Sequence, residues 1–479
     1  MLALHESPRS SLSLLPVIDA LADRYCVIAP DTPGYGLSDP LPGETPSLDD
    51  FLDVIAGLLD DLGVERVAIY GAHTGAALAT AFAVREPHRV TALVLDGLSA
   101  FDAEEVAAFR TRYLTPYEPH WDGRHVMALW SRAKDLFTWF PWYEQSAGRR
   151  LATEPQAIGV LHKSALGFLQ AGAEYAKAYT LAAAYQPNAV LQALRAPATV
   201  IARPDDLIAD HLDRLMQGPS WEITWLGPDL EEWAQALVAG IARGDTPDTA
   251  QPPTASADGS RFLAVGAGWL HVMLAGPMDG PVRVLLPGLP GDLSALLAAQ
   301  SNLHPQDRVV AISPPGCGRS DPLSDPTAGL EAVIDALDAA LQALRVEPAS
   351  LAGEGASAVI ATLWARRRGW PIEVAAIDPP AWLATGAPLP DGPLLTVLPP
   401  AWDGTHLTGA WFQLRDLQLY DIPPGRGPPL RRRNSDSLDV RRFDRLFRSY
   451  VEGPECAALL AQVVDHLRTH PADRLPPKD

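Results

Sequence analysis

The sequence has little cysteine, no long apolar run and no excess of positive charge. Its 479 residues include three cysteines (Cys26, Cys317 and Cys456), which are far apart and form neither a disulfide framework nor a zinc-binding spacing. So few cysteines favour a reducing, cytoplasmic setting. No apolar stretch reaches the roughly 18 residues of a membrane span, so no membrane partner is expected. The formal net charge of −20 argues against nucleic acid or an anionic membrane as a partner.

Motifs for targeting, cofactors and metals are also missing. Residues 1–10 have neither the basic start nor the apolar stretch of a signal peptide. There is no Gly-rich phosphate-binding loop, so no cofactor is expected. No set of metal ligands stands at short spacing, so no metal is expected either. One alternative stays open here, a metal cluster of His5, His73 and His125.

What the sequence does contain is a long internal repeat. The stretch "APDTPGYGLSDPLPG" at 29–43 returns as "AISPPGCGRSDPLSD" at 311–325, an offset of 282 residues. The same offset links Gly71 to Gly353. A near-constant offset across different segments indicates a tandem duplication of one large domain.

Short apolar runs alternate with helical patterns inside each copy. This alternation predicts an α/β fold with a mostly parallel sheet that is flanked by helices. We expect a first domain at 1–245, a linker at 246–260 and a second domain at 261–479. Each domain is expected to carry a helical cap, at about 101–197 in the first and from about 381 in the second.

The two copies look incomplete at opposite ends. The second copy begins with a hairpin pattern at 261–276 that the first copy lacks, and it ends before the last strands of the first copy. Missing edge strands leave unpaired backbone groups. Three explanations stay open: the hairpin reaches back to the first sheet, the copies complete each other in a homodimer, or the chain is shortened at its start.

The stretch "YGAHTGA" at 70–76 reads as the sharp turn between a strand and a helix that carries G-x-S-x-G in hydrolases, with His73 in the place of the nucleophile. "LHESPRSS" at 4–11, "APDTPGYGLSDP" at 29–40 and "ARPDD" at 202–206 stand in order around it. With these segments the chain resembles the α/β-hydrolase superfamily over almost its whole length, twice. It also resembles a subgroup of that superfamily with histidine at this turn.

The resemblance implies a nucleophile, an acid and a late histidine, but this set is broken. His73 replaces the nucleophile, and Pro228 and Asp229 stand where a Gly-His pair is expected. In the second copy Gly355 occupies the nucleophile position. Ser357 is expected to begin the following helix and not to stand at the tip of the turn, so it is not counted as a nucleophile.

The remaining candidates for chemistry lie in the first copy. An imidazole takes or gives a proton near neutral pH, so His73 is predicted to act as a base. The backbone N–H of Thr74 is expected at the oxyanion position. His5 is a candidate second donor to the oxyanion. Asp205, which matches the acid position, or else Asp96, is expected to orient an imidazole.

Candidates for substrate binding come from the predicted cap. Trp139 and Trp142 belong to an aromatic run, 135–145, that could line an apolar pocket. His125 belongs to the motif "WDGRH", which returns as "WDGTH" around His406 in the copy without a nucleophile. That recurrence favours a role in cap structure for the motif, as a turn that opens a helix.

Two functions therefore remain open. The leading hypothesis is a hydrolase or proton-transfer enzyme that acts without a serine nucleophile on a small apolar carbonyl or ester-like compound, with its site in the first domain. The alternative is a catalytically inactive homologue that acts as a binding or scaffold protein.

Overall fold

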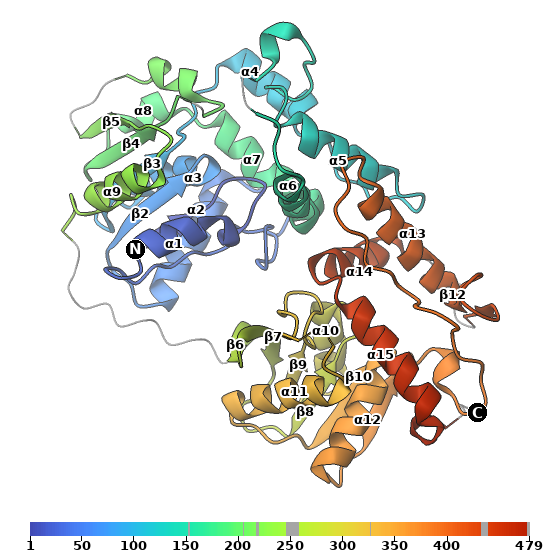
Figure 1. Cartoon of the computed structure of the whole chain (residues 1–479). Coiled ribbons are helices and arrows are strands. Elements are labelled where there is room, and N and C mark those ends of the chain that lie inside the picture. The colour runs from blue at the N-terminus through green and yellow to red at the C-terminus, as the bar shows by residue number, and fades with distance from the viewer. Residues whose placement is uncertain are drawn as a thin grey trace. The chain divides into compact units, whose positions relative to one another are not determined.

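The computed structural model describes residues 1–151, 154–204, 206–216, 220–245, 258–325, 327–432 and 439–476. Contacts divide the chain into two compact units, Met1–Glu118 with Leu129–Ala255 and Pro119–Ala128 with Ser256–Asp479 (Figure 1). The segment 119–128, which the sequence places in the first cap, therefore groups with the second unit. None of the helices in the described part of the chain is both long and apolar enough to cross a membrane.

The first unit is built around a parallel sheet. Its strands in the described residues follow the order β1 (Leu2–Leu4), β2 (Val67–Ala72), β3 (Val90–Asp96), β4 (Ala198–Ala202) and β5 (Trp221–Trp225). Strands β1 to β4 are buried throughout. Near-continuous apolar strands are typical of a parallel sheet that is covered on both faces.

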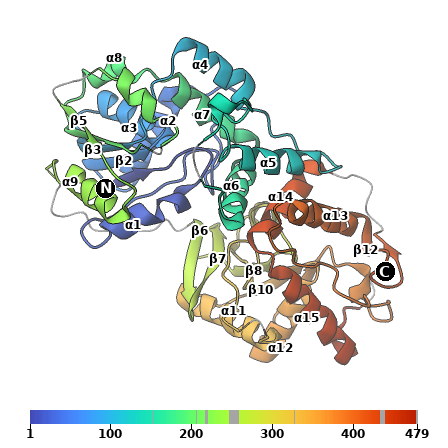
Figure 2. The ribbon, with the colours of Figure 1, turned by 45° about the horizontal axis from the view of Figure 1, so that its top comes forward.

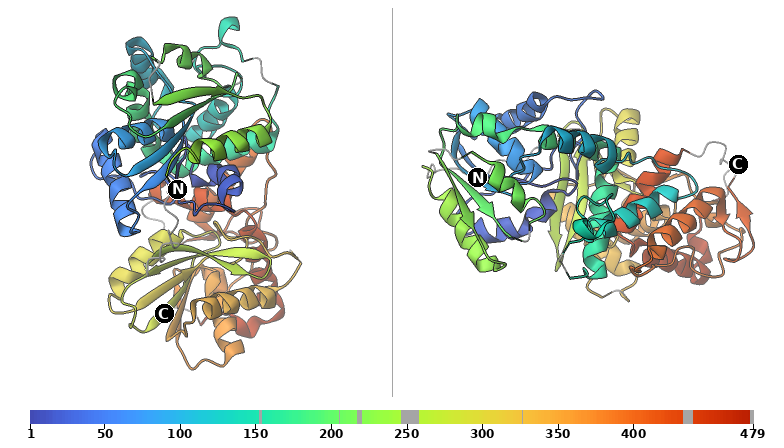
Figure 3. Two further views of the ribbon diagram at one scale, coloured as in Figure 1. Left: turned by 90° about the vertical axis from the view of Figure 1, so that its left-hand side faces the viewer. Right: turned by 90° about the horizontal axis from the view of Figure 1, so that it is seen from above.

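Helices cover both faces of this sheet (Figure 3). The helices that flank it are α1 (Leu15–Leu21), α2 (Leu48–Asp61), α3 (Thr74–Arg85) and α9 (Leu230–Ile241). Helices α1 and α9 share a core with one set of alternate strand residues, which includes Ala68, Tyr70 and Ala72. Helix α3 crosses the other face, where Gly71 meets its backbone. The predicted α/β fold with a mostly parallel, helix-flanked sheet is confirmed.

Further helices stand between β3 and β4. They are α4 (Ala103–Ala108), η2 (Phe109–Tyr113), α5 (Arg124–Asp135), α6 (Ile158–Ala171), η4 (Gly172–Glu174), α7 (Tyr175–Ala184) and α8 (Pro187–Leu191). They occupy the stretch that the sequence predicts as the first cap. A cap inserted here lies after a central strand, where it can cover the carboxyl edge of the sheet.

The second unit contains a mixed sheet. The order in the described residues is β11 (Val374–Ile377), β10 (Ser350–Glu354), β8 (Val282–Leu286), β9 (Arg308–Ile312), β7 (Gly268–Ala275) and β6 (Gly259–Val265), with a small sheet of β12 (Tyr420–Ile422) and β13 (Leu430–Arg431). Its helices are α10 (Leu293–Leu303), α11 (Leu330–Leu344), α12 (Ser357–Arg368), α13 (Thr405–Leu419), α14 (Val440–Glu452) and α15 (Cys456–Thr469). Strands β8 to β11 are parallel, and β7 and β6 are antiparallel to their neighbours.

The predicted hairpin at 261–276 forms as β6 and β7 (Figure 2), and β7 pairs with β9 of its own sheet. The explanation in which this hairpin reaches back to complete the first sheet is therefore wrong. The hairpin also accounts for a difference between the copies. The apolar run "RYCVIAP" at 24–30 has the pattern of a strand, but in the described residues it makes only a single bridge, Leu2 to Ile28, whereas β9 is a full strand with partners on both sides. A segment that pairs on one side only gains fewer ladder hydrogen bonds.

His271 on β7 gives the second unit a predictable response to acid. Burial lowers the pKa of His271 to about 4, and Arg319 acts in the same direction. In the unfolded chain the pKa of His271 is near 6.5, so the unfolded state binds the proton more readily than the folded state does. The neutral, buried His271 therefore contributes to the free energy of unfolding, and this contribution is complete above pH 6.5. It is lost as the pH falls from 6.5 to 4, and the loss amounts to about 2 kcal/mol at pH 5.

The measurement is the free energy of unfolding at pH 7 and pH 5 for the wild type and for His271→Gln. The glutamine does not titrate and can keep the contact that the His271 ring makes with the Ser260 hydroxyl, 2.8 Å away. We expect the variant to lose less stability between the two pH values than the wild type does. An equal loss in both proteins contradicts the prediction.

Candidate active site

The turn between β2 and α3 presents His73 at its tip. His73 has φ 45° and ψ −103°, a conformation that is costly for a residue with a side chain. The turn needs small residues on both sides. A Cβ atom at Gly71 would lie 2.3 Å from the Gly75 carbonyl oxygen, and one at Gly75 would lie 2.1 Å from the Leu4 carbonyl oxygen. The spacing of the two glycines thus allows the strand, the turn and the helix to pack closely.

His73 and Thr74 line a cavity of about 560 Å³ within the first unit. Aromatic side chains of the cap form much of its wall, namely Phe101, Phe109, Tyr113, Phe137, Phe140, Phe168 and Tyr179. Glu6, Arg9, Asp96 and Arg203 are the charged side chains that line it besides His73. A largely apolar hollow with a few convergent polar groups is the usual form of a small-molecule site.

Asp206 is the acid that the structure places beside His73. Its Oδ2 lies 3.4 Å from His73 Nε2, and the Asp206 side chain is 6% exposed against 37% for His73. Gly97 makes room for this pair, since a Cβ atom there would lie 2.9 Å from the imidazole and 3.0 Å from Asp206 Oδ2. Asp205, the acid that the sequence favours, lies outside the described residues.

His5 is held by backbone groups. The Thr32 N–H donates to His5 Nε2 at 2.9 Å, so the other ring nitrogen, Nδ1, carries the hydrogen and donates to the Glu6 carbonyl oxygen at 2.9 Å. The ring is 1% exposed, and burial lowers the pKa of His5. Both nitrogens are therefore occupied in ordering the loop after β1, and His5 is not among the described residues that line the cavity.

The Asp96 carboxylate is engaged by two donors. Tyr70 Oη donates to Asp96 Oδ2 at 3.1 Å, and Trp233 Nε1 donates to the same oxygen at 3.0 Å. Burial, and then the neighbouring Asp96 charge, raise the pKa of Tyr70 well above its usual value. The His73 N–H donates to the Asp96 carbonyl oxygen at 2.8 Å, so Asp96 supports the turn through its backbone.

Thr74 begins α3 directly after His73, and it lines the cavity. Backbone N–H groups in the first turn of a helix have no acceptor within the helix. The Thr74 hydroxyl is buried and has no hydrogen-bond partner among the described residues. The site therefore offers a hydroxyl and a helix N-terminus next to the imidazole.

The predicted substrate-binding residues of the cap lie elsewhere. Trp142 Nε1 donates to the Tyr113 carbonyl oxygen at 3.2 Å, and Trp139 forms a bridge with Arg150. Neither tryptophan is among the described residues that line the cavity. Phe137 and Phe140, from the same aromatic run, line it instead. The aromatic stretch 135–145 thus lines the cavity, as the sequence suggests, but with two phenylalanines in place of the two tryptophans.

His125 belongs to the second unit. Its ring packs against Trp411 with centroids 4.4 Å apart, and its Nε2 lies 3.7 Å from Asp444 Oδ1. His125 Nδ1 accepts from the N–H five residues earlier at 3.2 Å, and His406 Nδ1 does the same at 3.0 Å. The shared hydrogen bond shows that W-D-G-x-H builds the same turn before a helix in both copies.

The turn of the second unit is arranged differently. Gly355 stands at its tip with φ 56°, and Ser357 begins α12 with its buried hydroxyl donating to the Pro287 carbonyl oxygen at 2.6 Å. Glu354 Oε2 accepts from the Gly288 N–H at 3.0 Å, and burial raises the pKa of Glu354. A protein carboxylate thus takes up a backbone donor beside this turn.

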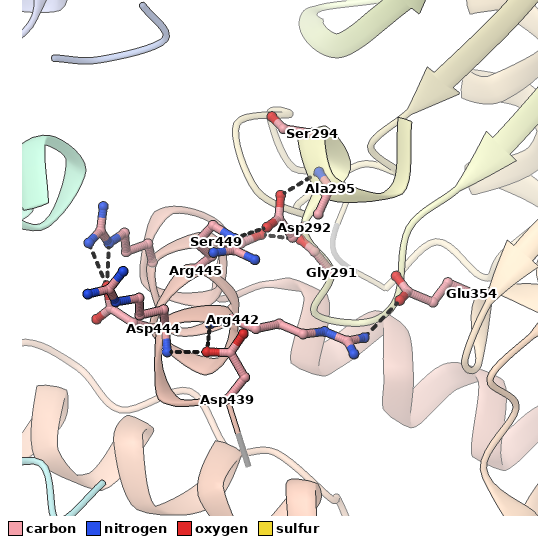
Figure 4. Close-up of polar contacts among 12 residues, drawn as sticks. Gly291, Asp292, Ser294, Ala295, Glu354, Asp439, Arg442, Asp444, Arg445 and Ser449 are labelled. Atoms are coloured by element: carbon pink, nitrogen blue, oxygen red, sulfur yellow. Dashed lines mark hydrogen bonds and ion pairs between the residues drawn. The ribbon is translucent and has the colours of Figure 1, made fainter. Parts of the chain in front are cut away.

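Helix α14 is attached to the same region by polar contacts (Figure 4). Arg445 Nε donates to Asp292 Oδ2 at 2.7 Å, and Arg442 Nη2 lies 3.9 Å from Glu354 Oε1. The Ser449 hydroxyl donates to the Gly291 carbonyl oxygen at 2.7 Å. The polar groups around this turn therefore have partners within the protein, in contrast to the Thr74 hydroxyl of the first unit.

Comparison with known proteins agrees with this architecture. Residues 4–213 match the family described as the alpha/beta hydrolase fold. Residues 4–213 thus belong to the α/β-hydrolase superfamily. The predicted resemblance is thereby confirmed at the level of the superfamily.

Several curated proteins are similar to this chain over part of its length. The chain is 41% identical over 81 residues to 2-hydroxy-6-oxo-2,4-heptadienoate hydrolase of Pseudomonas putida, which is 17% of this chain and 29% of the relative. It is 33% identical over 107 residues to haloalkane dehalogenase 2 of Mycobacterium tuberculosis, 22% of this chain and 37% of the relative. It is 30% identical over 121 residues to an uncharacterized hydrolase of Saccharomyces cerevisiae, 25% and 40% respectively. The chain thus spans 29–40% of the length of these curated relatives.

Among solved structures, a meta-cleavage product hydrolase from Pseudomonas fluorescens is similar to this chain at 19% identity and a TM-score of 0.36. The match covers 50% of this chain and 89% of that one. An esterase from Thermogutta terrifontis is similar at 21% identity and a TM-score of 0.39, with 50% and 86% covered.

Proposed function

We propose that the first unit is a hydrolase or proton-transfer enzyme for a small apolar carbonyl or ester-like compound, and that it works without a serine nucleophile. The observation that carries this proposal is the pair of His73 and Asp206 at the cavity, with Nε2 and Oδ2 3.4 Å apart. In this proposal His73 replaces the serine-based machinery of the superfamily as a general base.

The proposed chemistry follows from this pair. Asp206 favours the tautomer in which Nε2 carries the hydrogen, and this leaves Nδ1 of His73 with the lone pair. Nδ1 takes a proton from water as the water oxygen adds to the carbonyl carbon, or it takes one from an acidic carbon of the substrate. The negative charge that forms on the carbonyl oxygen is stabilised by the N–H groups at the start of α3. In hydrolysis the carbonyl then re-forms as its bond to the leaving group breaks, and the protonated imidazole gives its proton to that group; in proton transfer the imidazole returns the proton to another carbon of the enolate.

Asp206→Asn tests the orienting role. The carboxylate stabilises the imidazolium that forms during the reaction, and charges at such a distance interact by about 1–4 kcal/mol, so we expect kcat to fall about 10-fold to 100-fold on the best substrate of a panel of esters, lactones, epoxides and β-diketones. Glu232→Gln, on the exposed side of α9, serves as the matched carboxylate control. An unchanged kcat in Asp206→Asn would remove Asp206 from the proposal.

The second candidate function is a catalytically inactive binding protein. It is favoured by the segment after β5, where Asp229 caps α9 and accepts from the N–H groups of Glu231 and Glu232 at the place expected for the late histidine. His73 is the one histidine among the described residues that line the cavity. If the wild type turns over no member of the panel faster than His73→Ala does, the binding function is preferred.

Two broader expectations stay with the proposal. The recurrence of the sheet, the turn and the W-D-G-x-H motif supports a tandem duplication, in which the second unit is the degenerate copy. A homodimer is also proposed, because residues 24–30 leave the outer side of the first sheet without a strand partner in the described part of the chain. The molecular mass in solution tests the dimer, which a monomeric mass would exclude.

A further inference from the structure

Arg203 stands at the same edge of the first sheet as the proposed catalytic pair. It comes directly after β4, whose Ile201 pairs with Asp96 at the end of β3, and Asp96 pairs in turn with Ala72, just before His73. Ligands of open parallel sheets bind outside the carboxyl ends of the strands. Arg203 and His73 therefore follow strands that are separated by β3 alone, and both line the 560 Å³ cavity.

The guanidinium of Arg203 has no partner within the described part of the chain. Its Nε is enclosed by protein and makes no hydrogen bond, and no described carboxylate lies within ion-pair distance of any of its nitrogens. Buried polar atoms are nearly always hydrogen-bonded, so the lone Nε donor of this half-buried side chain is unusual. The cavity thus contains a cation whose natural complement is an anion.

The other arginine of the cavity provides a contrast. Arg9 Nε lies 3.4 Å from Glu6 Oε1, and the Arg9 side chain is 48% exposed. Its charge is therefore compensated by the protein and by water. The Arg203 charge, in contrast, acts on the interior, since it opposes the rise in the pKa of Tyr70 that burial and Asp96 cause. Arg203 is thus the arginine that a ligand in the cavity would meet without displacing a partner that belongs to the described residues.

We propose that the cavity of the first unit binds a monocarboxylate with an apolar body, and that Arg203 holds the carboxylate. The inference rests on the proposed function only for the idea that the cavity is the substrate site. The planar guanidinium matches a carboxylate through two parallel hydrogen bonds. Glu6 and Asp96 line the same cavity and disfavour a second negative charge on the ligand. The unpartnered Thr74 hydroxyl is available to a polar atom of the ligand beside His73.

The test compares two ligands of the same shape, 4-phenylbutyrate and 4-phenylbutyramide, by isothermal titration calorimetry on the full chain. Hydrogen bonds to a charged partner correspond to about 10-fold to 100-fold in affinity, so we expect the wild type to bind the carboxylate tighter than the amide by that factor. Arg203→Gln is expected to lose this preference and to keep its affinity for the amide. Arg203→Lys keeps the positive charge but cannot form two parallel hydrogen bonds to a carboxylate, so it is expected to retain part of the preference for the carboxylate over the amide.

Arg9→Gln is the matched control and is expected to keep the full preference. Equal affinity of the wild type for both ligands, or no binding of the carboxylate, overturns the proposal without any variant. A preference that survives in Arg203→Gln overturns it as well, whatever the result for Arg9→Gln. His73→Ala separates this inference from the proposed function. If the activity of His73→Ala equals that of the wild type, the catalytic proposal is wrong. If His73→Ala still prefers the carboxylate to the amide, the role of Arg203 in binding stands on its own.

Discussion

Replacing His73 by glycine is expected to abolish most of the activity and to leave the fold at least as stable as before. A positioned general base contributes about 10²-fold to 10⁴-fold to a rate, so kcat should fall by that factor on the best substrate of the panel. No other histidine among the described residues lines the cavity and could replace it.

The stability of the same variant follows from the backbone. His73 has φ 45°, and Gly355, at the corresponding turn of the second unit, has φ 56°. A residue with a side chain pays about 1–3 kcal/mol for such a conformation, whereas glycine pays only about 0.5–1 kcal/mol in extra chain entropy. We therefore expect His73→Gly to match the wild type or to exceed it by about 1 kcal/mol. His73→Ala keeps the unfavourable conformation and is expected to show no such gain.

The measurements are kcat on the panel and the free energy of unfolding in urea. The exposed His88→Ala provides a control in which one imidazole is removed from the surface of the same unit. If His73→Gly turned over substrate at the rate of the wild type, the base would have to be another group. If it unfolded well before the wild type, the turn would depend on contacts of the imidazole rather than on its backbone conformation.

The sequence predicts the turn well because the turn depends on local chemistry. An apolar strand, two glycines four residues apart and a helix of small residues together indicate that geometry, and β2, Gly71, Gly75 and α3 have it. The strand expected at 24–30 is different. Its apolar pattern matches that of β9, but a strand also needs partners, and the hairpin that pairs with β9 belongs to the second sheet. A pattern in one segment does not say which other segment lies beside it.

The site shows the same limit at the level of single side chains. "ARPDD" offers two adjacent aspartates, of which the motif favours Asp205; Asp206 lies beside His73, and Asp205 is outside the described residues, so its role stays a prediction. His5 was a candidate because of its loop, but its partners are backbone groups of Glu6 and Thr32, and Thr32 is 27 residues away. A pattern can find the loop or the turn that carries a residue. The direction of a side chain depends on distant segments, which no short motif contains.

Gly75→Ala is expected to destabilise the first unit strongly, and it tests the close crossing on which the site depends. A Cβ atom at this position would lie 2.1 Å from the Leu4 carbonyl oxygen and 2.6 Å from the Leu4 carbonyl carbon. Backbone atoms of a buried strand cannot turn aside as a flexible side chain can, so α3 would have to move away from β1. Overpacking of this kind costs about 3 kcal/mol.

The matched control is Gly57→Ala in α2, where a Cβ atom meets nothing within 4 Å and the position is exposed. Alanine there is expected to stabilise the first unit by about 0.5–1 kcal/mol, because it favours the helix and restricts the unfolded chain.

The second unit shows that the distance between this helix and the facing strand can be larger. Ser357, at the position that corresponds to Gly75, has a side chain that reaches the Pro287 carbonyl oxygen at 2.6 Å. Urea titration of both variants measures the difference. Equal midpoints for Gly75→Ala and the wild type would mean that α3 and β1 can separate at little cost, and the position of His73 would then not be fixed by this contact.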